Sequence, residues 1–102
     1  MINETQLEAE IQTKGLNAPR LTPEHIDSCI KYVEYWVVPN TTSTVCAMVL
    51  QNNFVIIGKS AAASMANFDE EIGKKIAYSD AREQIWALEG YLLKDKLFNE
   101  AH

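Results

Sequence analysis

Residues 58–60, Gly-Lys-Ser, have the ending of a phosphate-binding P-loop. The complete motif is G-x-x-x-x-G-K-[ST], in which the glycines let successive backbone N–H groups turn toward the phosphates. Asn53 stands where the first glycine is needed, and residues 54–57 form an apolar, partly β-branched run that favours a strand. A strand cannot wrap around a phosphate, so we reject a nucleotide-hydrolase loop at this position.

A second candidate for chemistry is the pair His25 and Cys29, which lie four residues apart and would meet on a helix. A thiolate nucleophile also needs an orienting group and oxyanion donors, and no such set is recognisable. The two histidines and two cysteines, with His102 at the end of the chain, match no zinc-site spacing. We therefore expect a core cysteine beside a first-turn histidine, with no catalytic residue, no metal and no cofactor.

A cationic and aromatic set lies further along the chain. Lys74, Tyr78 and Arg82 follow one another at intervals of four residues, so a helix would present them on one face. Two cations beside an aromatic ring can hold a phosphate and stack a base. With the polar groups that would join them if a strand end and a helix start converge, the candidate ligand-binding residues are Ser60, Asn67, Lys74, Lys75, Tyr78 and Arg82. The alternative is a solvated face, in which the lysines pair with glutamates four residues earlier and the tyrosine is half-buried.

The size and charge of the chain limit the function classes. A length of 102 residues suits one domain, and 47% apolar residues can build a core. A net charge of −5 disfavours broad nucleic-acid binding and anionic membranes, which need a basic surface. We expect no membrane span, because no apolar run reaches the roughly 18 residues that one requires. The N-terminal segment lacks the basic and apolar regions of a signal peptide, so we expect both thiols to be reduced.

Capping residues mark the first two helices that must position these groups. A short helix is expected from the Asn3 cap to the Gly15 stop. A second is expected to start at the Thr22 cap, with Pro23 in its first position, and to end at residues 39–40. Its apolar face follows helical spacing through Ile26, Cys29, Ile30, Val33 and Val37.

Residues 44–50 and 54–59 are two runs rich in Val and Ile that are joined by a Gln-Asn-Asn turn, which predicts a two-stranded antiparallel hairpin. Both faces of this hairpin are apolar, and helices from one short chain would struggle to cover two faces. We therefore expect a homo-oligomer through the hairpin. The alternative is that helices of the same chain sandwich the hairpin.

The last helix is expected to begin at Asn67 and to break near Gly90, while Gly73 indicates close backbone packing. The expected fold is therefore α+β, with a short N-terminal helix and then the order α-β-β-α, completed by oligomerisation. We expect an N-terminal arm and linker at residues 1–20, a single domain at 21–98 and a tail at 99–102.

Three pieces of the chain, residues 14–26, 51–61 and 67–93, resemble a family of small tailed-phage accessory proteins of unknown function. The family is named for gene product forty-nine of one podovirus and gene sixty-six of another. The resemblance covers roughly residues 14–98. Its most specific residues are Asn67, Phe68, Asp69, Ile72, Gly73, Lys74, Lys75, Ile76, Ala77, Ile85, Trp86, Leu88, Gly90 and Tyr91.

The resemblance implies a phage or prophage protein that is made in the cytoplasm of the infected bacterial host, and it brings no activity or catalytic residue. Small phage accessory proteins often act by binding, so we expect a non-enzymatic inhibitor of a host defence or regulatory protein. The alternative is an oligomeric sponge that sequesters a nucleotide immune signal on the cationic and aromatic set. A third hypothesis is an assembly or scaffold factor.

Overall fold

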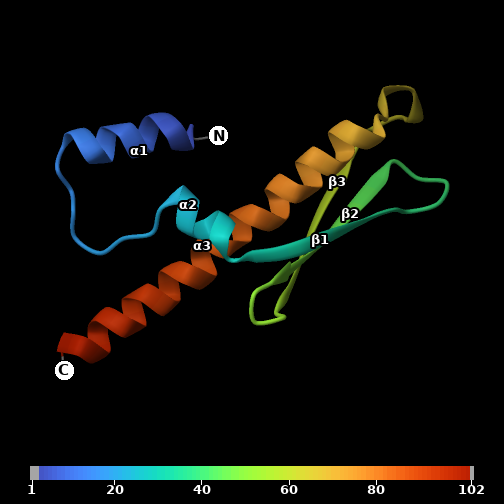
Figure 1. Ribbon diagram of the computed structural model, residues 1–102. Coiled ribbons are helices and arrows are strands. Elements are labelled where there is room, and N and C mark those ends of the chain that lie inside the picture. Colours follow the sequence, from blue (N-terminus) through green and yellow to red (C-terminus); the bar gives the residue numbers. More distant parts are fainter. Residues whose placement is uncertain (1–2, 102) are drawn as a thin grey trace.

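The computed structural model describes residues 3–101, which form an antiparallel sheet and a layer of helices (Figure 1). Residues 1, 2 and 102, at the ends of the expected arm and tail, lie outside the described part. In chain order the elements are α1 (Glu4–Thr13), α2 (Pro23–Ser28), β1 (Ile30–Val37), β2 (Ser43–Leu50), β3 (Val55–Ala61), the 3-10 turn η1 (Met65–Asn67) and α3 (Glu70–Ala101). The predicted α+β class is confirmed.

The sheet has the order β1-β2-β3, and both neighbouring pairs are antiparallel. The predicted hairpin corresponds to β2 and β3. Asn53 adopts a left-handed backbone with φ of 69°, and its N–H donates to the carbonyl of Leu50 at 2.9 Å. Asparagine tolerates this conformation better than most residues, which is why this turn can be tight.

The core lies between the sheet and α3, which crosses one face of β2 and β3 (Figure 1). Alternate residues of β2 and β3 point into this layer, because successive side chains of a strand face opposite sides. The buried hydrophobic residues are Ile26, Cys46, Met48, Leu50, Ile56, Ala77, Ala81 and Ile85.

Two glycines allow the strand layer and α3 to approach closely. A Cβ on Gly58 of β3 would lie 2.2 Å from the Ala77 carbonyl oxygen and 2.5 Å from the Ala81 nitrogen. A Cβ on Gly73 of α3 would lie 2.7 Å from Oγ1 of Thr44. Side-chain atoms do not fit at these separations, so the close packing predicted at Gly73 is confirmed.

The predicted caps of the first two helices are also confirmed. The side chain of Asn3 accepts a hydrogen bond from the N–H of Gln6 at 3.0 Å, which satisfies one of the free donors at the start of α1. The hydroxyl of Thr22 accepts from the N–H of His25 at 3.1 Å, and Pro23 occupies the first position of α2.

The predicted length of the second helix is wrong, and with it the prediction of a two-stranded sheet. The helix ends at Ser28, and the following residues form the third strand, β1. Residues 31–38 are rich in aromatic and β-branched side chains, which pack well on a pleated sheet and lose rotamer freedom in a helix. Strand pairing with β2 therefore outweighs the helical spacing of the apolar residues.

The predicted break near Gly90 is also wrong, because α3 runs without interruption from Glu70 to Ala101. One glycine costs only about 1 kcal/mol in a helix, which the neighbouring turns offset. Asn67 lies in η1 and does not cap α3; Asp69 does so, since its Oδ1 accepts from the N–H of Ile72 at 3.0 Å. No helix within residues 3–101 combines the length and the apolarity needed to cross a bilayer.

Candidate functional site

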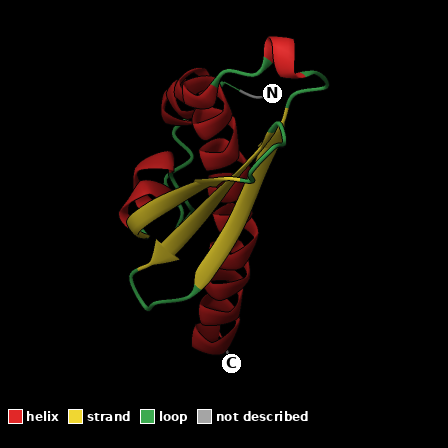
Figure 2. Cartoon of the chain, turned by 90° about the vertical axis from the view of Figure 1, so that its right-hand side faces the viewer, coloured by secondary structure: helices red, strands yellow, loops and turns green. Residues whose placement is uncertain are grey.

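The face of the sheet that points away from α3 is an uncovered surface. Figure 2 shows the three strands with the helices all on the opposite side. From the register, this outer sheet face includes three rows that span all three strands: Tyr32–Val49–Val55, Glu34–Ala47–Ile57 and Trp36–Val45–Lys59. Seven of these nine side chains are apolar or aromatic. Side chains as large as Trp36 and Ile57 are 59% and 55% exposed, so nothing within residues 3–101 covers them.

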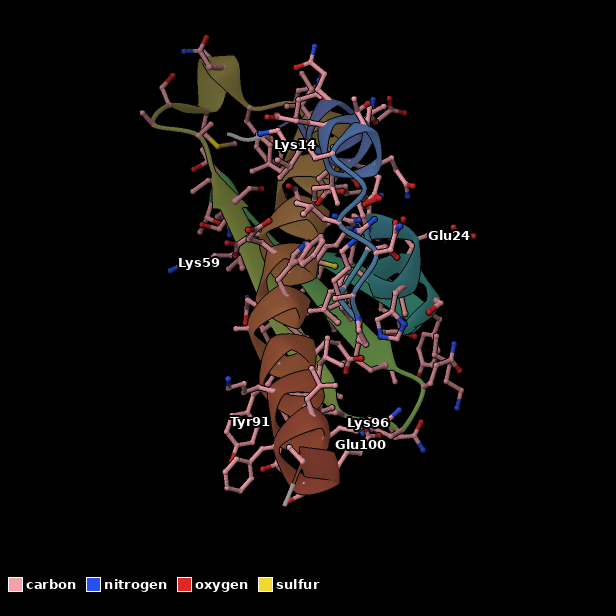
Figure 3. The ribbon with its side chains drawn as sticks, turned by 90° about the vertical axis from the view of Figure 1, so that its left-hand side faces the viewer. Lys14, Glu24, Lys59, Tyr91, Lys96 and Glu100 are labelled. Carbon is pink, nitrogen blue, oxygen red and sulfur yellow. The ribbon has the colours of Figure 1, made fainter. Side chains whose placement is uncertain are left out.

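The two charged residues of the outer sheet face occupy opposite edges. Glu34 lies on β1 and Lys59 lies on β3, one row apart. In Figure 3 the side chain of Lys59 points away from the body of the molecule. The face therefore has an apolar centre with one acidic edge and one basic edge.

The rest of the Gly-Lys-Ser stretch is held by α3. The N–H of Lys59 donates to Oδ2 of Asp80 at 2.9 Å. The hydroxyl of Ser60 donates to the Gly73 carbonyl at 2.7 Å. Together with the close packing of Gly58, these bonds give the tripeptide a structural role in joining β3 to α3.

Three of the predicted ligand-binding residues do gather. Lys74, Lys75 and Tyr78 line a shallow cavity of about 480 Å³ together with Tyr35 and Glu71. The Lys74 ammonium lies 5.7 Å from the centre of the Tyr35 ring and 3.4 Å from Oε1 of Glu70. Burial raises the pKa of the Tyr78 phenol, and the charge of Asp27 raises it further. Burial likewise raises the pKa of Tyr35, so both phenols are neutral hydrogen-bond donors at neutral pH.

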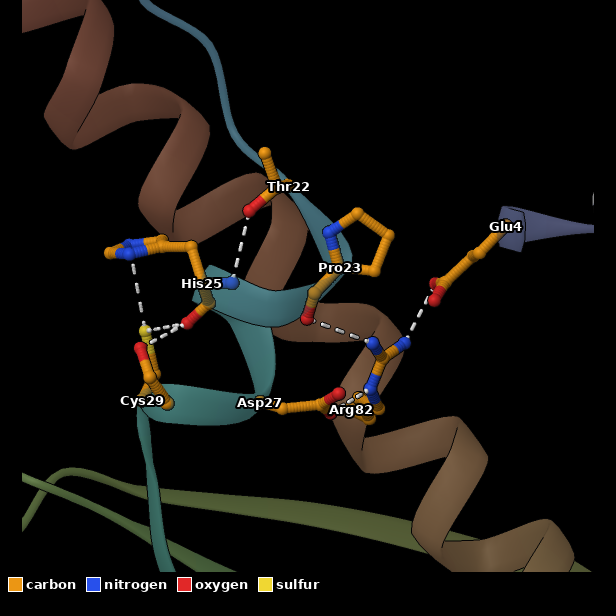
Figure 4. A network of polar contacts seen from close by, with 8 residues as sticks. Glu4, Thr22, Pro23, His25, Asp27, Cys29 and Arg82 are labelled. Carbon is orange, nitrogen blue, oxygen red and sulfur yellow. Dashed lines mark hydrogen bonds and ion pairs between the residues drawn. The ribbon is translucent and has the colours of Figure 1, made fainter. Parts of the chain in front are cut away.

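The other three predicted residues lie elsewhere. Asn67 is exposed in η1, and Ser60 bonds to the backbone of α3. Arg82 is held by carboxylates: it pairs with Glu4 and with Asp27, each at 2.7 Å, and its side chain is only 15% exposed (Figure 4). The bonds to Glu4 and then to Asp27 raise the pKa of Arg82, so its charge is already neutralised by the fold.

A larger groove separates α1 from α3. It has a volume of about 880 Å³, and the apolar residues that line it include Leu7, Ile11, Ile76 and Trp86. Its lining also carries four carboxylates, from Glu4, Glu8, Asp80 and Glu83, against one lysine, Lys75. Ion pairs to arginine engage two of these carboxylates, Glu4 and Glu8.

His25 and Cys29 meet as their spacing predicts, and a third group joins them. Nε2 of His25 lies 2.7 Å from Oε1 of Glu89 on α3 and 3.8 Å from Sγ of Cys29. Burial, followed by the charge of Glu89, raises the pKa of the Cys29 thiol. Cys29 is half-buried beside the core, as the sequence predicts, whereas His102 lies outside the described residues.

Sequence reasoning missed the residues that β1 contributes to the outer sheet face, chiefly Tyr32 and Trp36. The available signal was the concentration of aromatic and β-branched side chains along residues 32–38. Glu89 was missed for another reason: 64 positions separate it from His25, so no local motif could connect the two.

Comparison with known proteins gives one match. The family model described as the phage protein (N4 Gp49/phage Sf6 gene 66) family matches residues 21–97, from just before α2 to near the end of α3. No curated protein and no solved structure matches the chain. The matched range contains the outer sheet face and lies outside α1.

Proposed function

Because the chain belongs to the phage protein (N4 Gp49/phage Sf6 gene 66) family, we propose that it is a non-catalytic binding protein that acts in the cytoplasm of the infected bacterium. It pairs with a second copy through the outer sheet face, and the pair inhibits a host defence or regulatory protein. The observation that carries this proposal is the uncovered apolar sheet.

An exposed apolar sheet face of this kind needs an occupant. Exposed patches of contiguous apolar residues mark interaction surfaces in soluble proteins. Two sheets that pack face to face bury their apolar rows at a separation of about 10 Å. Trp36, Ile57 and Val55, all at least half exposed, would supply exposed apolar area to such an interface.

The placement of charge favours a second copy as the occupant. In a symmetric dimer with its two-fold axis parallel to β2, β1 of each copy lies over β3 of the other. Lys59 then faces Trp36 of the second copy and lies one row, or about 7 Å along the strand, from its Glu34. The acidic edge of each copy therefore meets the basic edge of the other, which gives two such contacts in the dimer, and the cation also reaches an aromatic ring.

Charge reversal tests this pairing. Glu34→Lys places two cations together at each edge, so we expect the dimer dissociation constant to rise at least tenfold in sedimentation equilibrium. The double variant Glu34→Lys/Lys59→Glu restores opposite charges and should recover most of the loss. A double variant that dimerises no better than the single one would contradict the proposed arrangement.

The groove between α1 and α3 is the surface best suited to the host protein. Its apolar lining and its excess of carboxylates fit a basic, amphipathic segment. We expect a host protein to bind stoichiometrically, with binding lost in Glu83→Lys and retained in Glu100→Lys, which changes the same charge at the far end of α3. If a tag at either end recovers no stoichiometric partner, host inhibition by binding fails.

One observation favours a nucleotide sponge as a second candidate. Lys74 and Lys75 lie beside Tyr35 and Tyr78 around one cavity, and this set can hold a phosphate and stack a base. Calorimetry with cyclic nucleotides and ADP-ribose derivatives would then detect binding that weakens in Lys75→Ala and persists in Lys94→Ala. Absence of heat with every ligand would remove this candidate.

A further inference from the structure

We propose that His25, Cys29 and Glu89 form a site for a divalent transition-metal ion, with Zn²⁺ as the best fit. The site lies at the junction of α2 and α3, away from the outer sheet face, and the proposed function does not require it. It departs from the expectation of no metal, which rested on spacing along the sequence alone.

The three potential ligand atoms already converge. Nε2 of His25, Sγ of Cys29 and a carboxylate oxygen of Glu89 all lie within 4.8 Å of one another. Ligand atoms around a tetrahedral zinc ion are roughly 3.5 Å apart, given bonds of about 2.0–2.3 Å. The distance of 3.8 Å from Nε2 to Sγ is close to this ligand-to-ligand separation. The 2.7 Å from Nε2 to Oε1 must open by less than about 1 Å for both atoms to bind one ion.

The backbone holds these ligands in place. The Thr22 cap begins α2, so His25 and Cys29 stand one turn apart on the same side, and their side chains point toward each other (Figure 4). The carbonyl of Cys29 accepts from the N–H of Gln51 at 3.0 Å, which ties the end of α2 to the end of β2. Glu89 comes from the middle of α3, and rigid elements position ligands better than loops do.

The ligand types select the class of ion. An imidazole nitrogen and a thiolate favour zinc-type ions over Mg²⁺ and Ca²⁺, which prefer oxygen ligands. The thiolate and the carboxylate together neutralise a divalent charge. Three protein ligands leave a fourth position for water, and the 48% exposed side chain of His25 shows that solvent reaches the site.

Without a metal, the same geometry is a His25–Glu89 hydrogen bond beside a thiol. Substitution of the cysteine distinguishes these two alternatives, because the hydrogen bond does not need the sulfur whereas a bound metal does. Co²⁺ is a suitable probe, since it adopts the tetrahedral geometry of Zn²⁺ and its absorption spectrum reports a thiolate ligand directly.

Titration of the reduced full chain with Co²⁺ tests the proposal. We expect a thiolate-to-cobalt charge-transfer band with the visible bands of tetrahedral cobalt, and Zn²⁺ should bleach both. Zn²⁺ should also raise the melting temperature, because an ion that binds only the folded state stabilises it. No charge-transfer band in excess Co²⁺ would overturn the proposal.

Matched variants assign the ligands. Cys29→Ser should abolish the charge-transfer band, and His25→Ala and Glu89→Gln should each weaken affinity by about 100-fold, since even outer-sphere changes cost 10- to 100-fold. Cys46→Ala and Glu83→Gln change the same residue types outside the site and should bind Co²⁺ like wild type. A band that persists in Cys29→Ser, or disappears in Cys46→Ala with the fold intact by circular dichroism, would contradict the assignment.

Discussion

Gly58 is the residue on which the contact between β3 and α3 depends. Two backbone atoms of α3, the Ala77 carbonyl oxygen and the Ala81 nitrogen, lie where its Cβ would be. Backbone atoms inside a helix cannot move without breaking helical hydrogen bonds, so a methyl group here would separate strand and helix. Gly90 differs, because its nearest neighbour for a Cβ is the Leu21 Cδ1 at 3.9 Å, an ordinary contact distance.

Alanine substitution at these two glycines should therefore have opposite effects. We expect Gly58→Ala to lower the free energy of unfolding by at least about 2 kcal/mol through overpacking. Gly90→Ala should raise it by about 1 kcal/mol, because alanine costs less conformational entropy in a helix. Urea unfolding followed by circular dichroism measures both. A Gly58→Ala protein as stable as wild type would show that β3 and α3 do not approach as closely as described.

Two ion pairs link the helix α1 to the rest of the chain. None of its side chains is buried, and a ten-residue helix is marginal in isolation. Glu4 pairs with Arg82 of α3, and Glu8 pairs with Arg20 of the linker at 2.6 Å. The groove proposed for a host protein has α1 as one wall, so these ion pairs also keep the groove open to a partner.

Removing the two charges on α1 should release it. We expect Glu4→Gln/Glu8→Gln to lose amide-exchange protection across residues 4–13 while the sheet and α3 keep theirs. Glu10→Gln is the matched control, since Glu10 pairs with the exposed Lys14, which directly follows α1 and does not link the helix to α3 or to the linker beyond it. Protection of α1 that is unchanged in the double variant would show that apolar contacts, and not these ion pairs, hold the helix.

Acid should release α1 in the same way. Hydrogen bonding from Arg20 lowers the pKa of Glu8 below its ordinary value of 4.5. A carboxyl group whose pKa is lower in the folded state stabilises that state above the unfolded value and loses this contribution as the pH falls through the folded one. Exchange protection of α1 should thus persist at pH 5 and above and decline below about pH 4.5. Loss of protection already at neutral pH would contradict this.

The strand β1 shows why part of the fold was predictable from the sequence and part was not. Turn and cap chemistry is local, so the Asn3 and Thr22 caps and the turn at Asn53 could be predicted correctly. A bulge between Ile30 and Tyr32 shifts the register of β1 by one residue. Because of this shift, the inward-facing apolar residues are spaced at intervals of 4, 3 and 4, through Ile26, Ile30, Val33 and Val37. This spacing is also that of an amphipathic helix.

The candidate sites were also predictable where they depend on local spacing and unpredictable where they depend on distant residues. The sequence correctly predicts that three residues lie together, because helical spacing alone places Lys74, Lys75 and Tyr78 on one surface. Arg82 does not join these residues because it pairs with Glu4. The two lie 78 positions apart in the sequence, so no local pattern could predict their contact. The outer sheet face was partly predictable, since alternation in β2 and β3 exposes one apolar set, but its aromatic edge belongs to the missed strand.

The whole molecule is an incomplete sandwich. All helices within residues 3–101 lie on one side of a three-stranded sheet, and α3 extends well beyond the sheet toward its C-terminal end (Figure 1). A second copy on the outer sheet face would complete the layers and enclose Trp36 and Ile57. In that arrangement each copy keeps its α1–α3 groove exposed, so one pair presents two binding surfaces on opposite sides.

The mass of the protein in solution tests this pairing most directly. Light scattering after size-exclusion chromatography should give twice the mass of one chain for the wild type. Ile57→Lys should give a folded monomer, while Ile72→Lys should remain a dimer, because Ile72 is equally exposed at 56% but lies on α3. A wild-type monomer at all concentrations tested, or an Ile57→Lys protein that remains a dimer, would contradict self-association through the outer sheet face.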